Sequence, residues 1–186
     1  SLINSNLVNN INGANSSLKI ESQFLPGQHN SQNIAFAFAT IYCHLLQHQI
    51  KIDETAIISA IKEFEGLRHR MQIVGIIDNI KFINDSKATN AESTKNALET
   101  YDNIFWILGG AEKEGGIKTL APYFKKIHKA YLIGQASDNF AKTLNDHSVS
   151  FVKCDSLEVA IRKAFFDAKN VSLSKNNILL SPACSS

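Results

Sequence analysis

Hydrophobic and polar positions follow one repeating pattern from residue 71 onward. Short apolar runs typical of strands are separated by longer segments that have one apolar face, as helices do. The expected strands cover residues 71–77, 80–83, 104–108, 130–133, 150–153 and 177–180, and the expected helices cover residues 92–100, 117–127, 137–144 and 157–169. Because strands and helices alternate, the pattern predicts an α/β domain with a Rossmann-like, doubly wound and mainly parallel sheet. The first two strands have no helix between them, and Asp78 and Asn79 instead join them as a pair that accepts the positive φ of a tight hairpin.

The residues before this pattern are less regular. Residues 1–17 are rich in Asn and Ser, so we expect a loop or a frayed remnant of a sheet there. A first, buried helix is expected over residues 31–48, and its apolar positions are Ile34, Phe36, Ala37, Ala39, Ile41 and Leu45. A second helix should follow Asp53, its expected N-cap, and Gly66 is placed to end it. This second helix would bury Ala56, Ile57, Ala60, Ile61 and Phe64.

The change of pattern near residues 66–70 marks an expected domain boundary. It divides the chain into residues 1–66 and residues 67–186. With 186 residues, of which 44% are hydrophobic and 19% charged, the chain can bury one good core and a smaller second one.

Charge and cysteine content narrow the class of protein. A net charge of +2 is too small to indicate binding to nucleic acid or to an anionic membrane. No apolar run has the length of a membrane span, and the N-terminus lacks a signal-peptide pattern, so we expect a soluble, cytoplasmic protein. Cys43, Cys154 and Cys184 are far apart and odd in number, which favours reduced thiols over disulfides or a metal site.

One polar segment, Asn84-Asp85-Ser86-Lys87-Ala88-Thr89-Asn90, stands where an apolar strand ends and a helix should begin. In parallel α/β sheets ligands collect outside the carboxyl ends of strands, where backbone N–H groups and helix N-termini favour anions. Lys87 adds a full positive charge to that field. The segment is therefore our first candidate for a binding site.

The same segment resembles the start of the C-terminal domain in the D-glutamate-adding members of the Mur ligase family. Other blocks agree in order and spacing: residues 27–33 resemble the family's adenine-contacting G-x-H-N-x-x-N turn, and residues 66–72 resemble its interdomain segment. Residues 108–113 and 180–186 match further along the chain. Each short motif alone is weak evidence, but together they span most of the chain. The Asp-Ser-Lys-Ala-Thr-Asn core separates these members from sister ligases, which carry Ala-His motifs at that turn.

The resemblance implies an ATP-dependent ligase that adds D-glutamate to UDP-N-acetylmuramoyl-L-alanine through an acyl phosphate, in peptidoglycan synthesis. It implies a monomer with small-molecule partners only. The family's phosphate-binding glycine loop does not occur in the sequence, so we expect a fragment that starts inside the central ATP-binding domain and stops within the last motif. Mg²⁺ ligands are then expected on sequence outside this chain, and the chain alone should be inactive.

On the nucleotide side, the resemblance assigns Asn30 and Asn33 to the adenine, Asp85 to the ribose hydroxyls and Arg70 to the phosphates. Simpler roles stay open for each residue. The two asparagines would serve equally as helix caps, and Asp85 or Ser86 as a cap or turn residue. Arg70 would serve as a surface or interdomain ion-pair partner.

On the substrate side, the resemblance places Lys87 and Thr89 beside the D-glutamate carboxylates and the reacting centre, with Lys87 as the catalytic residue. Lys113 and Ser186 would bind the side-chain carboxylate. By itself Lys113, between Glu112 and Glu114, is an ordinary solvated loop lysine.

Two other functions remain open from the sequence. A sister ligase for another amino acid is one, although a histidine motif in place of residues 87–89 would favour it. A stand-alone nucleotide-binding or interaction module without catalysis is the other, and the sequence upstream of Ser1 would decide whether this second alternative holds.

Overall fold

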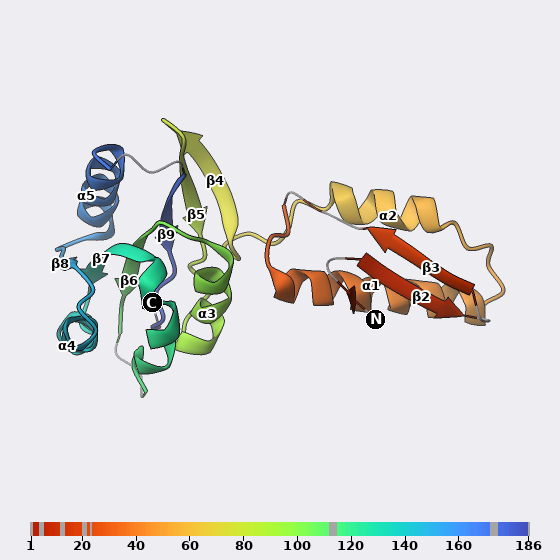
Figure 1. Ribbon diagram of the computed structural model, residues 1–186, viewed down its shortest axis with the longest axis horizontal. Coiled ribbons are helices and arrows are strands. Elements are labelled where there is room, and N and C mark those ends of the chain that lie inside the picture. Colours follow the sequence, from red (N-terminus) through yellow and green to blue (C-terminus); the bar gives the residue numbers. More distant parts are fainter. Residues whose placement is uncertain are drawn as a thin grey trace. The chain divides into compact units, whose positions relative to one another are not determined.

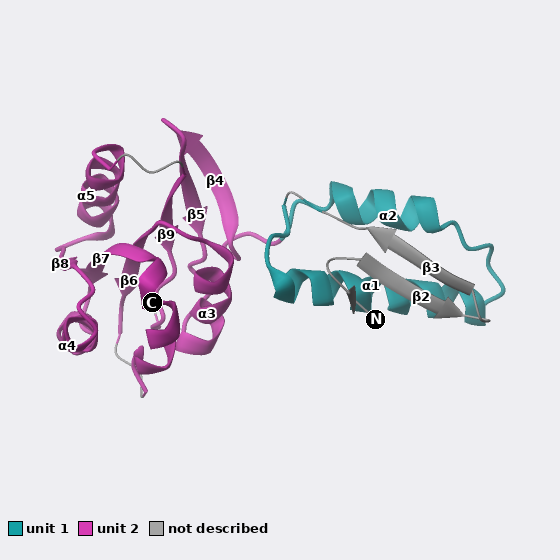
Figure 2. Cartoon of the chain, viewed as in Figure 1, with its two compact units in different colours: residues 1–66 teal, residues 67–186 magenta. Residues whose placement is uncertain are grey.

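The computed structural model divides the chain into two compact units, residues 1–66 and residues 67–186 (Figure 2). It describes residues 22, 24–111, 115–171 and 175–185, and the backbone of residues 2–3, 6–11 and 14–19. Within these residues, no helix is both long enough and apolar enough to cross a membrane.

The first unit combines a small antiparallel sheet with two helices (Figure 1). The strands β1 (Leu2–Ile3), β2 (Asn6–Ile11) and β3 (Ala14–Lys19) pair in the order β1-β2-β3. Most of residues 1–17 is therefore strand, so of the two alternatives for these residues the loop is wrong and a piece of sheet is present. Backbone hydrogen bonds hold such a sheet together, and they do not require the alternation of apolar and polar residues by which a strand is recognised in a sequence.

The helices α1 (Gln28–Gln47) and α2 (Glu54–Glu63) share a small core in which Ile34, Phe38, Ile57 and Ile61 are buried. Asp53 caps α2 as predicted, because its carboxylate accepts the Ala56 N–H at 3.0 Å.

The predicted apolar faces of both helices were too wide. Phe36 is 75% exposed, and Ile41 and Phe64 are exposed as well. Within the described residues each helix buries only the stripe that faces the other. Helix α2 ends at Glu63, ahead of Gly66, which follows with a φ of +86°.

The second unit is built on a single sheet of six strands. In spatial order these are β4 (Gln72–Ile77), β5 (Ile80–Asn84), β9 (Asn176–Leu180), β6 (Ile104–Gly109), β7 (Ile127–Ile133) and β8 (Phe151–Lys153). Only β4 and β5 are antiparallel, and their hairpin turn at Asp78 and Asn79 has φ values of +52° and +62°. The mainly parallel sheet and the tight hairpin are thus confirmed.

Helices cover both faces of this sheet, as a doubly wound fold requires. Side chains alternate along β6: Ile104, Trp106 and Leu108 belong to one core, and Phe105 and Ile107 to the other. The first core includes residues of α3 (Ala91–Thr100), the 3₁₀ helix η1 (Lys118–Lys126) and α4 (Ser137–Asp146), whereas α5 (Leu157–Lys169) packs on the second.

The helix over residues 117–127 was predicted in the right place but is 3₁₀ and not α-helical. Pro122 lies inside it, and a proline removes a backbone donor and restricts the residue before it.

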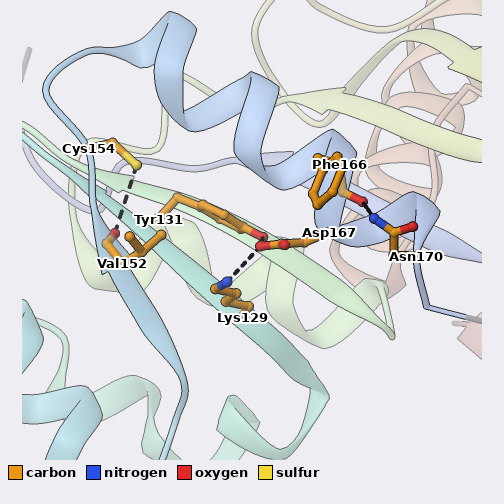
Figure 3. Close-up of polar contacts among 7 residues, drawn as sticks. All are labelled: Lys129, Tyr131, Val152, Cys154, Phe166, Asp167 and Asn170. Carbon is orange, nitrogen blue, oxygen red and sulfur yellow. Dashed lines mark hydrogen bonds and ion pairs between the residues drawn. The ribbon is translucent and has the colours of Figure 1, made fainter.

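A polar cluster links helix α5 to β7 of the sheet (Figure 3). The Tyr131 hydroxyl and the Lys129 ammonium of β7 both donate to the Asp167 carboxylate of α5, each at 2.7 Å. Partial burial disfavours the ionised carboxylate, but the two donors outweigh it and hold the pKa of Asp167 below its usual range. Burial raises the pKa of Tyr131, which therefore stays protonated as a donor.

Gly109, at the end of β6, should be essential to the close contact of this strand with Ile133 of β7. Its φ is +121°, and an added Cβ would stand 1.9 Å from the carbonyl oxygen of Ile133. We expect Gly109→Ala to lower the free energy of unfolding by about 2–4 kcal/mol. Gly75 is the matched control: it lies in β4 of the same sheet, a Cβ added there would have no atom within 4 Å, and its φ is outside the left-handed region.

Urea unfolding followed by tryptophan fluorescence measures this effect, because Trp106 is the chain's single tryptophan and lies in the second unit. Gly75→Ala should leave the transition unchanged or stabilise by up to about 1 kcal/mol. Equal effects of the two substitutions would contradict the packing at Gly109.

Candidate functional site

The candidate site lies at the carboxyl edge of the sheet. Strands β5, β9 and β6 are adjacent and parallel, with Asn84 opposite Leu180 and Ile107 opposite Leu180. The segments that follow these strands must therefore leave the sheet at the same edge. Ligands bind at this edge in parallel α/β sheets.

After β5, the chain forms a compact turn before α3. The Ala88 N–H donates to the Asp85 carbonyl at 2.9 Å, and the Thr89 N–H to the Lys87 carbonyl at 3.0 Å. Asn90 is the N-cap of α3, because its side chain accepts the Ser93 N–H at 2.8 Å. Neither Asp85 nor Ser86 is therefore the N-cap of α3, whereas the alternative role as turn residues stands, because both belong to this turn.

The segment before β4 is bonded to this turn. The Lys87 N–H donates to the His69 carbonyl at 3.1 Å, and the Met71 N–H donates to the Asp85 carboxylate at 3.1 Å. His69 and Met71 have φ values of +66° and +46°, which are uncommon without glycine and cost conformational energy. This bent conformation places Arg70 where its charge acts on Asp85.

Asp85 is the buried charge of the site, only 6% exposed. One carboxylate oxygen accepts from Met71, and the other accepts the Ser181 hydroxyl at 2.8 Å. Burial raises the pKa of Asp85 to about 6, against the opposing effects of the Ser181 and Met71 hydrogen bonds and the Arg70 charge. A neutral-to-acidic change of pH therefore alters the charge at the centre of the site.

After β9, residues 181–185 run between the segments that follow β5 and β6. The Asp85 N–H donates to the Leu180 carbonyl at 2.8 Å, and the Ala183 N–H donates to the Ala88 carbonyl at 3.0 Å. On the other side, the Gly109 N–H donates to the Pro182 carbonyl at 2.9 Å. These bonds connect all three strand-end segments through the backbone.

Glycines let the segment after β6 approach so closely. Gly110 has a φ of +146°, and an added Cβ would stand 2.3 Å from the Ser185 carbonyl oxygen. The Ala111 N–H donates to the same carbonyl at 2.9 Å. Only a residue without a side chain permits this contact, which gives the Gly109–Gly110 pair of the sequence motif a structural reason.

The structure brings four candidate residues together in the second unit: Arg70, Asp85, Lys87 and Thr89. Arg70 and Lys87 are exposed, and Thr89 is half-buried. The turn thus holds a cation by its backbone and leaves its side chain accessible. Lys113 and Ser186 lie outside the described residues.

Asn30 and Asn33 belong to the first unit, in the first two turns of α1. The Asn30 side chain donates to the Pro26 carbonyl at 2.8 Å, and Asn33 is exposed. Neither caps the helix, because Gly27 occupies the N-cap position and provides no side chain. The capping alternative is therefore wrong for both residues.

Sequence reasoning missed three residues that build the site: Thr94, Trp106 and Ser181. The Ser181 hydroxyl lies 3.0 Å from the Thr94 hydroxyl, and the Trp106 indole N–H donates to the Ser181 carbonyl at 2.9 Å. Ser181 lies in a matched block, but the sequence does not show that β9 pairs with β5 and β6. Thr94 and Trp106 look like ordinary core positions.

No group of three or more His, Cys, Asp or Glu side chains suited to a metal ion occurs among the residues that the structure describes. The described part of the site instead has two exposed cations, Arg70 and Lys87, and the half-buried Thr89 beside one buried carboxylate. Such a set fits anionic ligands, carboxylates or phosphates, at the edge of the sheet.

Comparison with known proteins agrees with this geometry. The family model "Mur ligase, glutamate ligase domain" matches residues 69–184. The chain is similar to proteins named UDP-N-acetylmuramoylalanine–D-glutamate ligase. A relative from Wolbachia sp. subsp. Brugia malayi is 50% identical over 84% of this chain and 30% of its own length. A relative from Rickettsia bellii is 46% identical over 90% of this chain and 36% of its own length. A relative from Agrobacterium fabrum is 43% identical over 94% of this chain and 36% of its own length.

The chain thus spans about a third of the length of these relatives. Solved structures show the same fold at low identity. The ligase MurC from Thermotoga maritima matches with a TM-score of 0.62 at 18% identity, over 93% of this chain and 37% of that one. MurF from Acinetobacter baumannii matches with a TM-score of 0.61 at 14% identity, over 91% of this chain and 37% of that one. With a family model that covers most of the second unit and relatives at this identity, the chain belongs to the Mur ligase family.

Proposed function

We propose that the protein containing this chain is an ATP-dependent ligase that joins D-glutamate to UDP-N-acetylmuramoyl-L-alanine through an acyl phosphate, in peptidoglycan synthesis. The main support is the meeting of the Lys87 turn with residues 181–185, in a chain whose relatives carry this ligase name. The names of these relatives favour D-glutamate over the amino acids of sister ligases.

The chemistry of amide formation explains the need for such a site. A carboxylate reacts at neutral pH only after its oxygen becomes part of a leaving group, which ATP provides by phosphorylating it. Positive charge must accompany the transferring phosphoryl group, and the incoming amine must be held against the acyl carbon. In this proposal Lys87 supplies charge at the reacting centre, and Thr89 orients a D-glutamate carboxylate beside it.

The second carboxylate of D-glutamate needs donors of its own. We assign Lys113 and Ser186 to it, following the family resemblance. The chain places Lys113 between Ala111 and Gly115 after β6, and Ser186 directly after Ser185. Ala111 and Ser185, the described residues nearest to them in sequence, are hydrogen-bonded to each other, and Ala183 of the same segment is bonded to Ala88 of the Lys87 turn.

For ATP, we propose that Arg70 approaches the phosphates and that Asn30 and Asn33 contact the adenine. The exposed guanidinium of Arg70 and the exposed amide of Asn33 fit these roles, and the half-buried Asn30 amide keeps its oxygen as an acceptor while its nitrogen donates to Pro26. Asp85 is proposed for the ribose hydroxyls through the lone pairs that Met71 and Ser181 leave open. Mg²⁺ would accompany the nucleotide, and we propose that its ligands lie on sequence outside this chain.

The remaining assignments follow from the same activity. Residues 1–66 would form the end of the central ATP-binding domain, and residues 67–186 most of the C-terminal domain. The proposed substrates are small molecules, and we place the protein in the cytoplasm, as a monomer that binds neither nucleic acid nor membrane.

Lys87 can be tested in the intact protein by Lys87→Ala. We expect kcat for ligation to fall about 10²- to 10³-fold, as it does when an oxyanion donor is removed, while stability changes by less than about 0.5 kcal/mol because the side chain is exposed. Phosphate release with all three substrates and a melting curve measure the two effects. Lys142→Ala, an exposed lysine on α4, is the control and should retain activity. Near-normal turnover of Lys87→Ala would contradict its assignment.

Lys113 can be tested by its effect on substrate preference. In the intact protein, Lys113→Met should raise KM for D-glutamate about 10-fold or more and leave KM for ATP unchanged, because a carboxylate loses its charged partner. Lys118→Met, an exposed lysine of η1, is the control. Equal effects on both substrates would place Lys113 near the nucleotide, and no effect would return it to the role of a solvated loop lysine.

A further inference from the structure

A buried serine connects the parts of the site that the proposed reaction must align. Ser181 is fully buried directly after β9, and its backbone and side chain contact three other segments. We propose that Ser181 is a positioning residue for ligation: through its hydroxyl, bonded to Asp85 and Thr94, it fixes residues 181–185 to the turn that carries Lys87 and Thr89. This inference rests on the proposed function for what is aligned, but not for the contacts themselves.

The backbone of Ser181 is fixed by β6. Its N–H donates to the Ile107 carbonyl at 3.1 Å, and its carbonyl accepts the Trp106 indole N–H at 2.9 Å. Trp106 is completely buried, so this bond is shielded from water. The serine is thus held on the sheet independently of its own hydroxyl.

The hydroxyl then extends this support to β5 and α3. It lies 2.8 Å from the Asp85 carboxylate and 3.0 Å from the Thr94 hydroxyl of α3. A hydroxyl donates only one proton at a time. When Asp85 is ionised, Ser181 donates to it and Thr94 donates to Ser181. When Asp85 is protonated, it can donate to Ser181 and Ser181 can donate to Thr94, so the two hydrogen bonds reverse direction and both pairs stay bonded.

This arrangement makes the charge of Asp85 sensitive to Ser181. Among the residues that the structure describes, the other charged or titratable groups coupled to Asp85 are Arg70, before β4, and Tyr101, at the end of α3. Arg70 and the Ser181 hydrogen bond both lower the pKa of Asp85, which burial raises to about 6. Loss of the serine hydroxyl removes one of the effects that keep Asp85 ionised near neutral pH, so the pKa must rise further.

The consequence for ligation concerns geometry more than binding. Lys87 and Thr89 are held by turn bonds, and residues 181–185 lead to the proposed carboxylate site at Ser186. If the hydroxyl is lost, the two segments keep their backbone bonds but lose the buried side-chain link between them. Small misplacements of reacting groups lower turnover strongly while each substrate still binds.

The first experiment compares variants of the intact protein in ligation. Ser181→Ala and Thr94→Val remove the two hydroxyls, and Thr94→Ser restores one of them. Thr143→Val is the matched control, because Thr143 is also buried on a helix but donates to the Asn139 carbonyl of its own helix. We expect kcat to fall about 10- to 100-fold for Ser181→Ala, with KM for ATP unchanged at a pH well above the Asp85 midpoint of the variant, where Asp85 is ionised in both proteins. Thr94→Val should show a smaller loss that Thr94→Ser reverses, and Thr143→Val none.

The second experiment needs no activity. In the 186-residue chain, Trp106 is the single tryptophan, so its indole ¹H–¹⁵N resonance is assigned without ambiguity. We expect this resonance to titrate with a midpoint near pH 6 in the wild type, as Asp85 is protonated and Ser181 reorients. In Ser181→Ala the midpoint of Asp85, followed by its ¹³C carboxyl resonance, should move up by about one pH unit. Thr143→Val should not move it.

These results separate the two ways in which the inference can fail. An unchanged Asp85 midpoint in folded Ser181→Ala would overturn the proposal, and so would equal losses of turnover in Ser181→Ala and Thr143→Val. If the wild-type protein fails to ligate D-glutamate while both titrations behave as expected, the proposed function is wrong, and with it the part of the inference that concerns ligation. A fall of kcat in Ser181→Ala together with the shifted midpoint would support the whole account.

Discussion

The parallel pairing of β9 between β5 and β6 is the constraint on which the second unit depends. β9 is the last strand in sequence but lies inside the sheet, where Ile178 and Leu179 contribute to the cores on its two faces (Figure 1). Without it, the β4–β5 hairpin has no neighbour in the sheet. Because β5, β9 and β6 point the same way, their following segments meet at one edge, and the candidate site exists only once the chain is complete to residue 185.

This topology also explains how exposed side chains are held in place without packing of their own. Lys87 is exposed, yet its turn is bonded through the backbone to His69 on one side and to residues 181–185 on the other. A cation on a fixed turn combines accessibility with a defined position, which is what a preorganised site needs. The cost appears nearby, in the positive φ of His69 and Met71 and in the burial of Asp85.

Much of this could be predicted from the sequence, because periodicity records which side chains a sheet buries. It located the six strands of the second unit, the Asp78–Asn79 hairpin and the turn with Lys87. It could not give the spatial order of the strands, since parallel pairing is set by crossovers distant in sequence, and so it missed Ser181 beside Asp85. In the first unit, it overestimated how much of α1 and α2 is buried.

The central claim is that the segments after β5, β6 and β9 together hold the acceptor amino acid. A crystal structure of the intact protein with ADP and the product UDP-N-acetylmuramoyl-L-alanyl-D-glutamate tests it most directly. The account predicts that the glutamyl carboxylates contact Lys87, Thr89 and the residues that follow Ser185. A glutamyl group bound instead at the segments after β7 and β8 would contradict it.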